Sequence, residues 1–337
     1  MRFLCLVDGH VIPPDRWMWN HLPQAASSDQ VDFLGVSSPD TFPRWGKILT
    51  YYPYFFKCAF EAILKSRQNT YDLIITWESK IGFSLAILRT LLGLSAPKLL
   101  TLAFSYKGIA MYSLPLGKIF IRTIDHITVP SLSEVNYYSN LLSYPRERIT
   151  HVPLGGYEIK PLSKPTFDIS PYVFSGGRSE RDYDTLFKAV TSLNIPIVVN
   201  ARRFNVQGLK CPKNVTINKI MPADQYFQIM NGTRFIVVPI QETNHAAGII
   251  SILQAMSIGK AVIATRTQST RDYIEDGTTG ILVDPSNPKI MREAIVYLWQ
   301  NPEFARKLGE EAQKKYNAFY TSKAFAMRNY QVIKKLL

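Results

Sequence analysis

The chain has 337 residues, of which 46% are hydrophobic and 12% aromatic, a composition that excludes a disordered protein. This length exceeds what one compact core usually organises and predicts two domains of ordinary size. The formal net charge of +13 calls for an anionic partner, and nucleic acid, phosphorylated small molecules and anionic lipid all qualify. Basic residues are spread along the chain without an arginine-rich tract, which favours a nucleotide and a bilayer surface over nucleic acid.

The cysteines and the apolar runs indicate the compartment. Cys5, Cys58 and Cys211 are widely separated, lack metal-ligand spacing and are expected to be core or strand residues of a protein in a reducing cytoplasm. Residues 1–7 lead directly into a strand and a polar loop, which is not the pattern of a signal peptide. The most apolar helix candidate, residues 81–94, is shorter than the roughly 20 residues of a membrane span. We therefore expect a cytoplasmic protein, either soluble or peripheral on the inner face of the membrane.

The first half alternates apolar, β-branched runs with amphipathic stretches, the pattern of a parallel, doubly wound sheet. Strands are expected at residues 3–7, 31–36, 73–77, 98–104 and 126–130, and helices at residues 47–66, 81–94, 108–122 and 133–142. Ligands of such sheets bind beyond the carboxyl ends of the strands. The candidate contacts of this half therefore follow strand ends: Asp8, Gly9, His10 and Ser105.

Two helices of the chain combine apolar and basic residues. Residues 47–66 begin with several aromatic side chains beside lysines, which fits either an interfacial helix or a core helix with one wet face. Residues 321–337 form an amphipathic basic helix, whose apolar face either meets a membrane or packs on the protein.

A glycine- and proline-rich stretch without periodicity interrupts the alternation and predicts a linker at residues 156–170. It separates a first domain, residues 1–155, from a second domain, residues 171–319. In the second domain the alternation restarts, with strands expected at residues 172–175, 196–200, 214–218, 234–239, 261–265 and 280–283, and helices at residues 183–193, 223–230, 248–259, 269–275, 288–299 and 302–316.

Two glycine-containing turns of the second domain are suited to phosphate. Gly248 opens a helix, so a ligand can approach the backbone closely, and the next amides lack partners within the helix. Periodicity alone is equally typical of an ordinary βαβ unit. The first strand ends in Gly176-Gly177-Arg178, followed by Arg181, and paired arginines bind phosphate oxygens well. The same residues would also suit a tight turn with solvated arginines, but their place at a strand's carboxyl end favours binding.

These pieces together resemble the carboxyl-terminal half of family-4, group-1 glycosyltransferases of the two-domain GT-B architecture. The most specific stretches are residues 254–265 (QAMSIGKAVIAT) and residues 274–283 (IEDGTTGILV). The resemblance covers residues 170–300 well, while the first half matches in layout and in residues 125–134 and 152–155. It implies an α/β fold of two doubly wound, Rossmann-like domains facing a cleft, with the last helix, about residues 320–337, crossing back to the first domain.

The resemblance also implies roles for individual residues. Gly176 and Gly177, with Arg178 and Arg181, would hold the donor diphosphate, and the amides of Gly248, Ile249 and Ile250 would cap the same phosphates. Gln254 stands where the family places a glutamate that binds ribose hydroxyls, and an amide still bonds two hydroxyls as donor and acceptor. These roles form the predicted donor site.

The sequence departs from the family at two further positions. Ala246 occupies the place of the glutamate near the transferred sugar, and Glu242 and His245 are the candidates to replace it from the same loop. Many members have a histidine after the fourth strand, where this chain has Phe104 and Ser105.

We therefore expect a retaining hexosyltransferase that is independent of metal and cofactor and uses a UDP-sugar or GDP-sugar. Its acceptor would be a glycan or lipid-linked molecule in polysaccharide or glycolipid assembly, its catalytic residues Arg178, Arg181, Glu242 and His245, and nucleic acid would not be a partner. The alternative is a catalytically decayed protein that binds nucleotide sugars or glycans, because the family's two acids are replaced.

Overall fold

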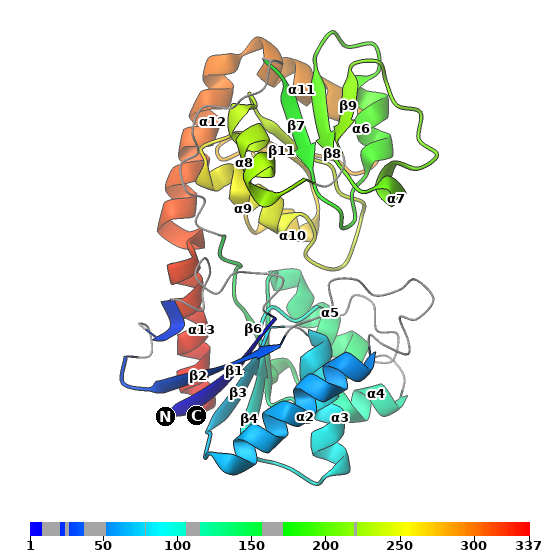
Figure 1. The fold of residues 1–337 in the computed structure, drawn as a ribbon. Coiled ribbons are helices and arrows are strands. Elements are labelled where there is room, and N and C mark those ends of the chain that lie inside the picture. Colours follow the sequence, from blue (N-terminus) through cyan, green and yellow to red (C-terminus); the bar gives the residue numbers. More distant parts are fainter. Residues whose placement is uncertain are drawn as a thin grey trace. The chain divides into compact units, whose positions relative to one another are not determined.

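A computed structural model describes residues 1–8, 21–23, 27–36, 52–77, 79–105, 115–156, 171–218 and 221–337. They form two compact units, Met1–Gly155 with Ser322–Leu337, and Gly156–Thr321. Each unit contains a six-stranded, wholly parallel sheet with flanking helices (Figure 1), so the predicted α/β fold with two doubly wound sheets is confirmed. Gly9, His10, residues 157–170 of the expected linker, and parts of the helices expected at residues 47–66 and 108–122 lie outside the described residues.

The sheet of the first unit has the strand order β2-β1-β3-β4-β5-β6. Its strands are β1 (Arg2–Asp8), β2 (Gln30–Val36), β3 (Leu73–Thr76), β4 (Lys98–Thr101), β5 (His126–Val129) and β6 (Ile149–His151). Its helices are α2 (Tyr52–Gln68), α3 (Ser79–Leu91), α4 (Pro115–Ile121), α5 (Leu132–Leu142) and α13 (Ser322–Leu336). Strand β6 was not predicted; it has three residues and directly follows a short 3₁₀ turn.

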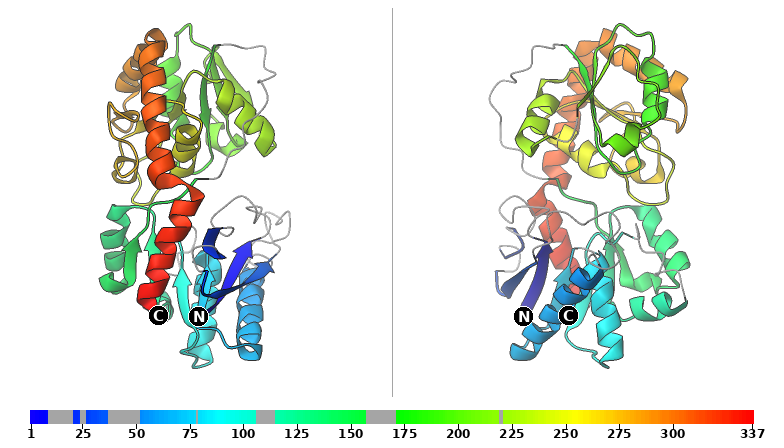
Figure 2. Two further views of the ribbon diagram at one scale, coloured as in Figure 1. Left: turned by 90° about the vertical axis from the view of Figure 1, so that its left-hand side faces the viewer. Right: turned by 45° about the vertical axis from the view of Figure 1, so that its right-hand side comes forward.

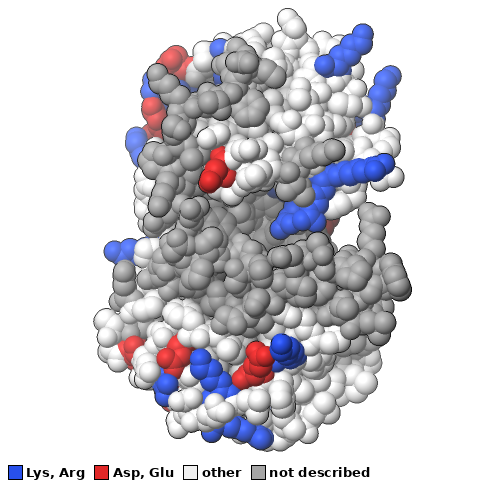
Figure 3. Space-filling view, in the orientation of Figure 1, with Lys and Arg blue, Asp and Glu red and all other residues white. Residues whose placement is uncertain are grey.

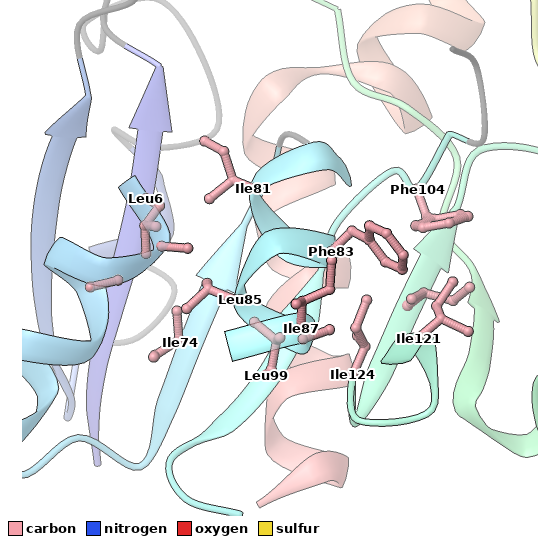
Figure 4. Packing of buried hydrophobic residues seen from close by; sticks show 14 of the residues in the cluster. Leu6, Ile74, Ile81, Phe83, Leu85, Ile87, Leu99, Phe104, Ile121 and Ile124 are labelled. Atoms are coloured by element: carbon pink, nitrogen blue, oxygen red, sulfur yellow. The ribbon is translucent and has the colours of Figure 1, made fainter. Parts of the chain in front are cut away.

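The core of the first unit lies between the sheet and its helices (Figure 4). Leu6, Ile74 and Leu99 extend from neighbouring strands toward Leu85 and Ile87 of α3. Both faces of β3 are covered, since all four of its residues are buried. A parallel strand covered on both faces is largely apolar, which explains why an apolar, β-branched run in the sequence predicted it.

The last helix, α13, belongs to the first unit, as the predicted crossing requires. The ring of Phe325 packs edge-on against Trp77 at 6.0 Å, and the Tyr330 hydroxyl donates to Asp29 Oδ2 at 2.6 Å. Phe325 and Ile333 are fully buried, so the apolar face of α13 packs on the protein. Figure 2 shows the helix running alongside the first sheet.

The sheet of the second unit has the order β12-β11-β10-β7-β8-β9. Its strands are β7 (Val173–Gly176), β8 (Ile197–Asn200), β9 (Val215–Asn218), β10 (Ile236–Val238), β11 (Val262–Thr265) and β12 (Ile281–Val283). Its helices are α6 (Tyr183–Val190), α7 (Arg203–Val206), α8 (Ala223–Gly232), α9 (Ile249–Ser257), α10 (Gln268–Arg271), α11 (Pro288–Gln300) and α12 (Pro302–Lys315). The short helix α7 was not predicted.

One cysteine differs from its prediction. Cys5 and Cys58 are buried, as expected, but Cys211 is exposed because it lies in the loop before β9, so its assignment to the core was wrong. Within the described ranges, no helix is both long and apolar enough to span a membrane.

His126 begins β5 and joins it to β6. Its Nε2 atom lies 2.8 Å from Thr150 Oγ1. Burial, together with the nearby charge of Arg148, lowers the pKa of His126 from 6.5 to about 4. The folded protein therefore holds this imidazole neutral at neutral pH.

We expect the free energy of unfolding to fall as pH falls from 6.5 to about 4, because the unfolded chain takes up a proton at His126 that the folded protein refuses. In His126→Asn this contribution disappears. Urea denaturation at about pH 7 and about pH 5 should show a smaller loss in the variant, by about 1–2 kcal/mol after allowance for partial exposure. Equal losses of unfolding free energy in both proteins would contradict the lowered pKa of His126.

Candidate functional site

The loop after β7 is shaped by a glycine that makes room for an arginine. Gly177 has φ +131°, a conformation that residues with a β-carbon rarely adopt. A β-carbon added there would overlap the guanidinium group of Arg181, which folds back over the loop. The glycine therefore makes room first for a side chain of the protein itself.

Arg181 fastens this loop to helix α9. Its Nε donates to the carbonyl oxygen of Gly176 at 3.2 Å, and its Nη1 donates to that of Ser179 at 2.9 Å. Its Nη2 donates to Ser251 Oγ, in the first turn of α9, at 2.8 Å. The side chain is only 6% exposed, and burial lowers the pKa of Arg181. No carboxylate among the described residues forms an ion pair with it, so its charge is balanced by dipoles alone.

Helix α9 presents its amino end to the same place. Gly248 caps the helix with φ +77°, and a β-carbon there would press on Ile240. The amides of Ile249 and Ile250 are in the first turn and have no acceptor within the helix. The helix dipole adds partial positive charge at this end. A buried guanidinium and free helix amides together form a site for an anion.

Backbone pairing holds the two site loops together. The amide of Asp182 donates to the carbonyl oxygen of Pro239 at 3.1 Å, and that of Gln241 donates to the carbonyl oxygen of Glu180 at 2.9 Å. Arg181 and Ile240 form an antiparallel bridge between these bonds. The loop after β7 and the loop after β10 thus behave as one framework, which fixes Arg181 relative to α9.

The remaining predicted residues of this unit differ in exposure. Arg178 is exposed, and its carbonyl oxygen accepts from Asn205 Nδ2 at 2.9 Å, whereas Arg181 is buried. The sequence predicts the same role for both arginines, but in the structure Arg181 is buried and hydrogen-bonded within the protein and Arg178 is exposed. Gln254 is half-buried on α9.

The two candidate replacements for the missing glutamate, Glu242 and His245, lie in one loop but differ in exposure and in their contacts. Glu242 is exposed. His245 is half-buried, with Nδ1 at 2.7 Å from Thr243 Oγ1 and Nε2 at 3.9 Å from Glu180 Oε1. Glu180, in the loop after β7, thus places its carboxylate near the imidazole of His245.

The candidates of the first unit lie at the carboxyl edge of its own sheet. Asp8 ends β1, opposite Val36 of β2, and Gly9 and His10 lie outside the described residues. Ser105 is exposed, and its amide donates to Ser79 Oγ at the start of α3 at 2.9 Å. His151 lies at the end of β6 and lines a cavity beside α13.

Sequence reasoning missed the polar groups behind the glycine loop. The Tyr183 hydroxyl donates to the carbonyl oxygen of Gly177 at 2.9 Å. The Tyr226 hydroxyl is bonded to Ser251 and lies beside Gly176, and burial raises its pKa. Ser251 carried a signal, since it is the polar residue within the apolar first turns of α9 (IISIL). No sequence signal marked Tyr226, because its position beside Gly176 depends on how α8 packs.

Within the described ranges, no group of three or more histidine, cysteine, aspartate or glutamate side chains is arranged to hold a metal ion.

The comparison with family models identifies the region that contains α9. Residues 205–315 match the model of the group 1 glycosyl transferases. This part of the chain belongs to the group 1 glycosyltransferase family. The match includes Gly248 and Gln254, whereas the loop after β7 precedes it.

Several relatives match in sequence, and two of them align over more than half of this chain. D-rhamnosyltransferase WbpZ of Pseudomonas aeruginosa is 25% identical over 232 residues, which cover 62% of this chain and 58% of WbpZ. O-antigen chain mannosyltransferase C of Escherichia coli is 20% identical over 227 residues, which cover 62% of this chain and 60% of the relative. The matches thus span less than two thirds of each relative's length.

Solved structures show the fold of the whole chain. HepE of Anabaena, crystallised with UDP and glucose, superposes with a TM-score of 0.70 at 13% identity and covers 99% of this chain and 100% of HepE. Likeness at this level of identity establishes the fold alone, which is the two-domain GT-B fold.

We expect Gly177→Ala to destabilise the second unit by about 2–4 kcal/mol, since the new methyl group combines a strained φ with overlap on Arg181. Gly208→Ala is the matched control, because Gly208 also has a positive φ, +83°, but nothing within 4 Å of the added atom. The control should lose only about 1–2 kcal/mol. Urea denaturation measures both, and equal losses would mean that Arg181 does not occupy this space.

Proposed function

We propose that this protein is a retaining, metal-independent hexosyltransferase. It transfers a sugar from a UDP-sugar or GDP-sugar to a glycan or lipid-linked acceptor in polysaccharide or glycolipid assembly. The observation that carries the proposal is the buried Arg181 guanidinium beside the amino end of α9, at the carboxyl edge of a parallel sheet. This edge is where ligands of doubly wound sheets bind.

The chemistry of this site favours a diphosphate. A buried cation without a carboxylate partner among the described residues gains from a bound anion, because the anion replaces the water that burial removed. The free amides of α9 add directed donors, and exposed Arg178 adds a second cation that can bind two oxygens at once. HepE, which shares the fold, was solved with UDP and glucose.

The same groups suit the departure of the diphosphate. In the proposed reaction the bond between the sugar's anomeric carbon and the diphosphate oxygen breaks, and the acceptor oxygen forms the new bond on the same face. The acceptor's proton passes to the leaving diphosphate, so no protein nucleophile is needed. Preorganised amides and guanidinium groups stabilise the charge that develops on the leaving group, which is generally the largest catalytic contribution.

His245 is the stronger candidate to act near the sugar. Its Nε2 lies 3.9 Å from Glu180 Oε1, so a carboxylate stands beside the imidazole ring. The exposed Glu242 has no comparable partner among the described contacts. In the proposed enzyme, the Glu180–His245 pair replaces the glutamate that the family has at the position of Ala246.

The acceptor side of the proposal includes a peripheral position on an anionic membrane in the cytoplasm. The inner face of α2 packs in the core, but its outer face exposes Phe60 (50%) and Leu64 (42%) between Lys57 and Arg67. Apolar side chains flanked by cations are typical of interfacial helices. Figure 3 shows basic side chains beside acidic ones on the first unit, which argues against a uniform nucleic-acid surface on this face.

We expect transfer from at least one UDP-sugar or GDP-sugar, and a loss in kcat/KM of about 10²–10³-fold in Arg178→Ala, since one charge-assisted contact to the leaving group is removed. Lys188→Ala is the matched control, because Lys188 is an exposed cation of the same unit that pairs with Asp184. The control should keep full activity. A panel of donors with glycan and lipid-linked acceptors measures this.

The alternative function, a decayed transferase that binds nucleotide sugars or glycans, rests on the replacement of both family acids by Ala246 and Gln254. It would be established by retained nucleotide binding without turnover for any donor in the panel. Failure of every nucleotide to bind would contradict both the transferase and the nucleotide-sugar-binding alternative.

Gln254 tests the ribose contact separately from the phosphate contact. We expect Gln254→Glu to bind the donor at least as tightly as the wild type, because a carboxylate accepts from two hydroxyls, and Gln254→Leu to bind about tenfold more weakly. Calorimetry with the nucleoside diphosphate measures both. Unchanged affinity in Gln254→Leu would remove this residue from the site.

A further inference from the structure

The first unit contains a cavity of about 610 Å³ that none of the donor-site residues line. It lies between α13 and the region where β4 and β5 begin and β6 runs. Figure 2 shows α13 beside these strands. All of its lining residues belong to the first unit, whereas Arg181 and α9 belong to the second.

Basic residues predominate in the lining of this cavity. Lys98 and Arg148 contribute from the strand side, and Arg328 and Lys335 contribute from α13. Two carboxylates, Asp125 and Glu147, also line it. The positive groups therefore outnumber the negative ones two to one.

One of these carboxylates is already engaged elsewhere. Asp125 Oδ2 accepts from Arg89 Nη1 at 3.2 Å and from the amide of Leu99 at 2.7 Å. The Arg89 side chain is only 4% exposed, so Asp125 serves as the counter-charge of a buried cation. It does not offset the cations of the cavity.

Three of these cations have no ion-pair partner among the described residues. Lys98 donates to the carbonyl oxygen of Leu336, and Arg148 Nη1 donates to that of Arg122 at 3.3 Å. A carbonyl oxygen fixes a side chain but carries no net charge. Among the described residues, Lys98, Arg148 and Lys335 form no ion pair with a carboxylate.

Neutral polar groups also line the cavity. His126, Thr150 and Gln331 face it, and the imidazole of His126 lies 2.8 Å from the Thr150 hydroxyl. The charge of Arg148 contributes to lowering the pKa of His126, which shows that this arginine acts on the cavity wall. Phosphate groups are bound by such combinations of cations and neutral donors.

We propose that this cavity binds a phosphate-bearing anion, supplied either by the headgroup of an anionic lipid or by a soluble phosphate ester. The site is separate from the donor loops and does not depend on the proposed transferase activity. A ligand held between α13 and the first sheet would fasten the last helix to its unit, because it bridges cations from both.

Pyrophosphate is a suitable probe, and calorimetry measures its binding. Because the donor loops of the second unit also attract phosphate, the titrations are made in Arg178→Ala as well as in the wild-type protein. In the Arg178→Ala background, we expect Arg148→Gln with Lys335→Gln to weaken the remaining pyrophosphate binding at least about tenfold. Both substituted side chains are exposed, so the fold should be retained, and thermal unfolding verifies it.

Lys323→Gln is the matched control, because Lys323 is an exposed cation on the same helix that does not line the cavity. It should bind pyrophosphate as the parent does. The proposal is overturned if the double variant binds pyrophosphate as tightly as Lys323→Gln, or if Arg178→Ala alone abolishes all binding.

Vesicle flotation distinguishes the two sources of phosphate. Vesicles of phosphatidylcholine with phosphatidic acid present a phosphate monoester, and pure phosphatidylcholine vesicles are the blank. Flotation that requires phosphatidic acid and is lost in the double variant assigns the site to a lipid headgroup. Pyrophosphate binding without flotation assigns it to a soluble phosphate ester.

Discussion

The buried guanidinium group of Arg181 is the interaction on which the donor half of this protein depends. It bonds the carbonyl oxygens of its own loop and the Ser251 hydroxyl of α9, and thereby fixes the loop after β7 against the helix end. Desolvating a guanidinium group without a carboxylate partner is unfavourable, so binding of an anion at this site would be favourable. Gly177 makes the arrangement sterically feasible, and the backbone pairing of Glu180 and Asp182 to the neighbouring loop keeps it rigid.

The two units apply the same sheet to different tasks. In the second unit, the carboxyl edge places helix amides and Arg181 together, which is the arrangement that we propose to bind the leaving diphosphate. In the first unit, α13 closes over the other side of the sheet and leaves a basic cavity beneath it. Membership of residues 205–315 in the group 1 glycosyltransferases agrees with the task of the second unit. The basic excess of the chain is therefore partly explained by two separate sets of cations.

Much of the fold follows from local patterns in the sequence. Strands such as β3 are largely apolar because both faces are covered, and Gly248 marks the start of α9 because that turn has a positive φ. Short or exposed elements were missed, as β6 and α7 show, because three or four residues carry no period. The error at Cys211 has another cause, because cysteine spacing does not reveal that this residue lies in an exposed loop.

The site was predictable in composition but not in geometry. Sequence placed Arg178 and Arg181 together as phosphate ligands, yet only tertiary structure separates the exposed residue from the buried one, because the partner Ser251 lies 70 positions away. The most direct test of the account is the affinity for UDP and GDP against that for uridine and guanosine, measured by calorimetry. For the nucleotide that binds, the diphosphate should strengthen binding by about 100-fold or more, or about 3 kcal/mol. Equal affinity of nucleoside and nucleoside diphosphate would contradict the claim that Arg181 and α9 form a diphosphate site.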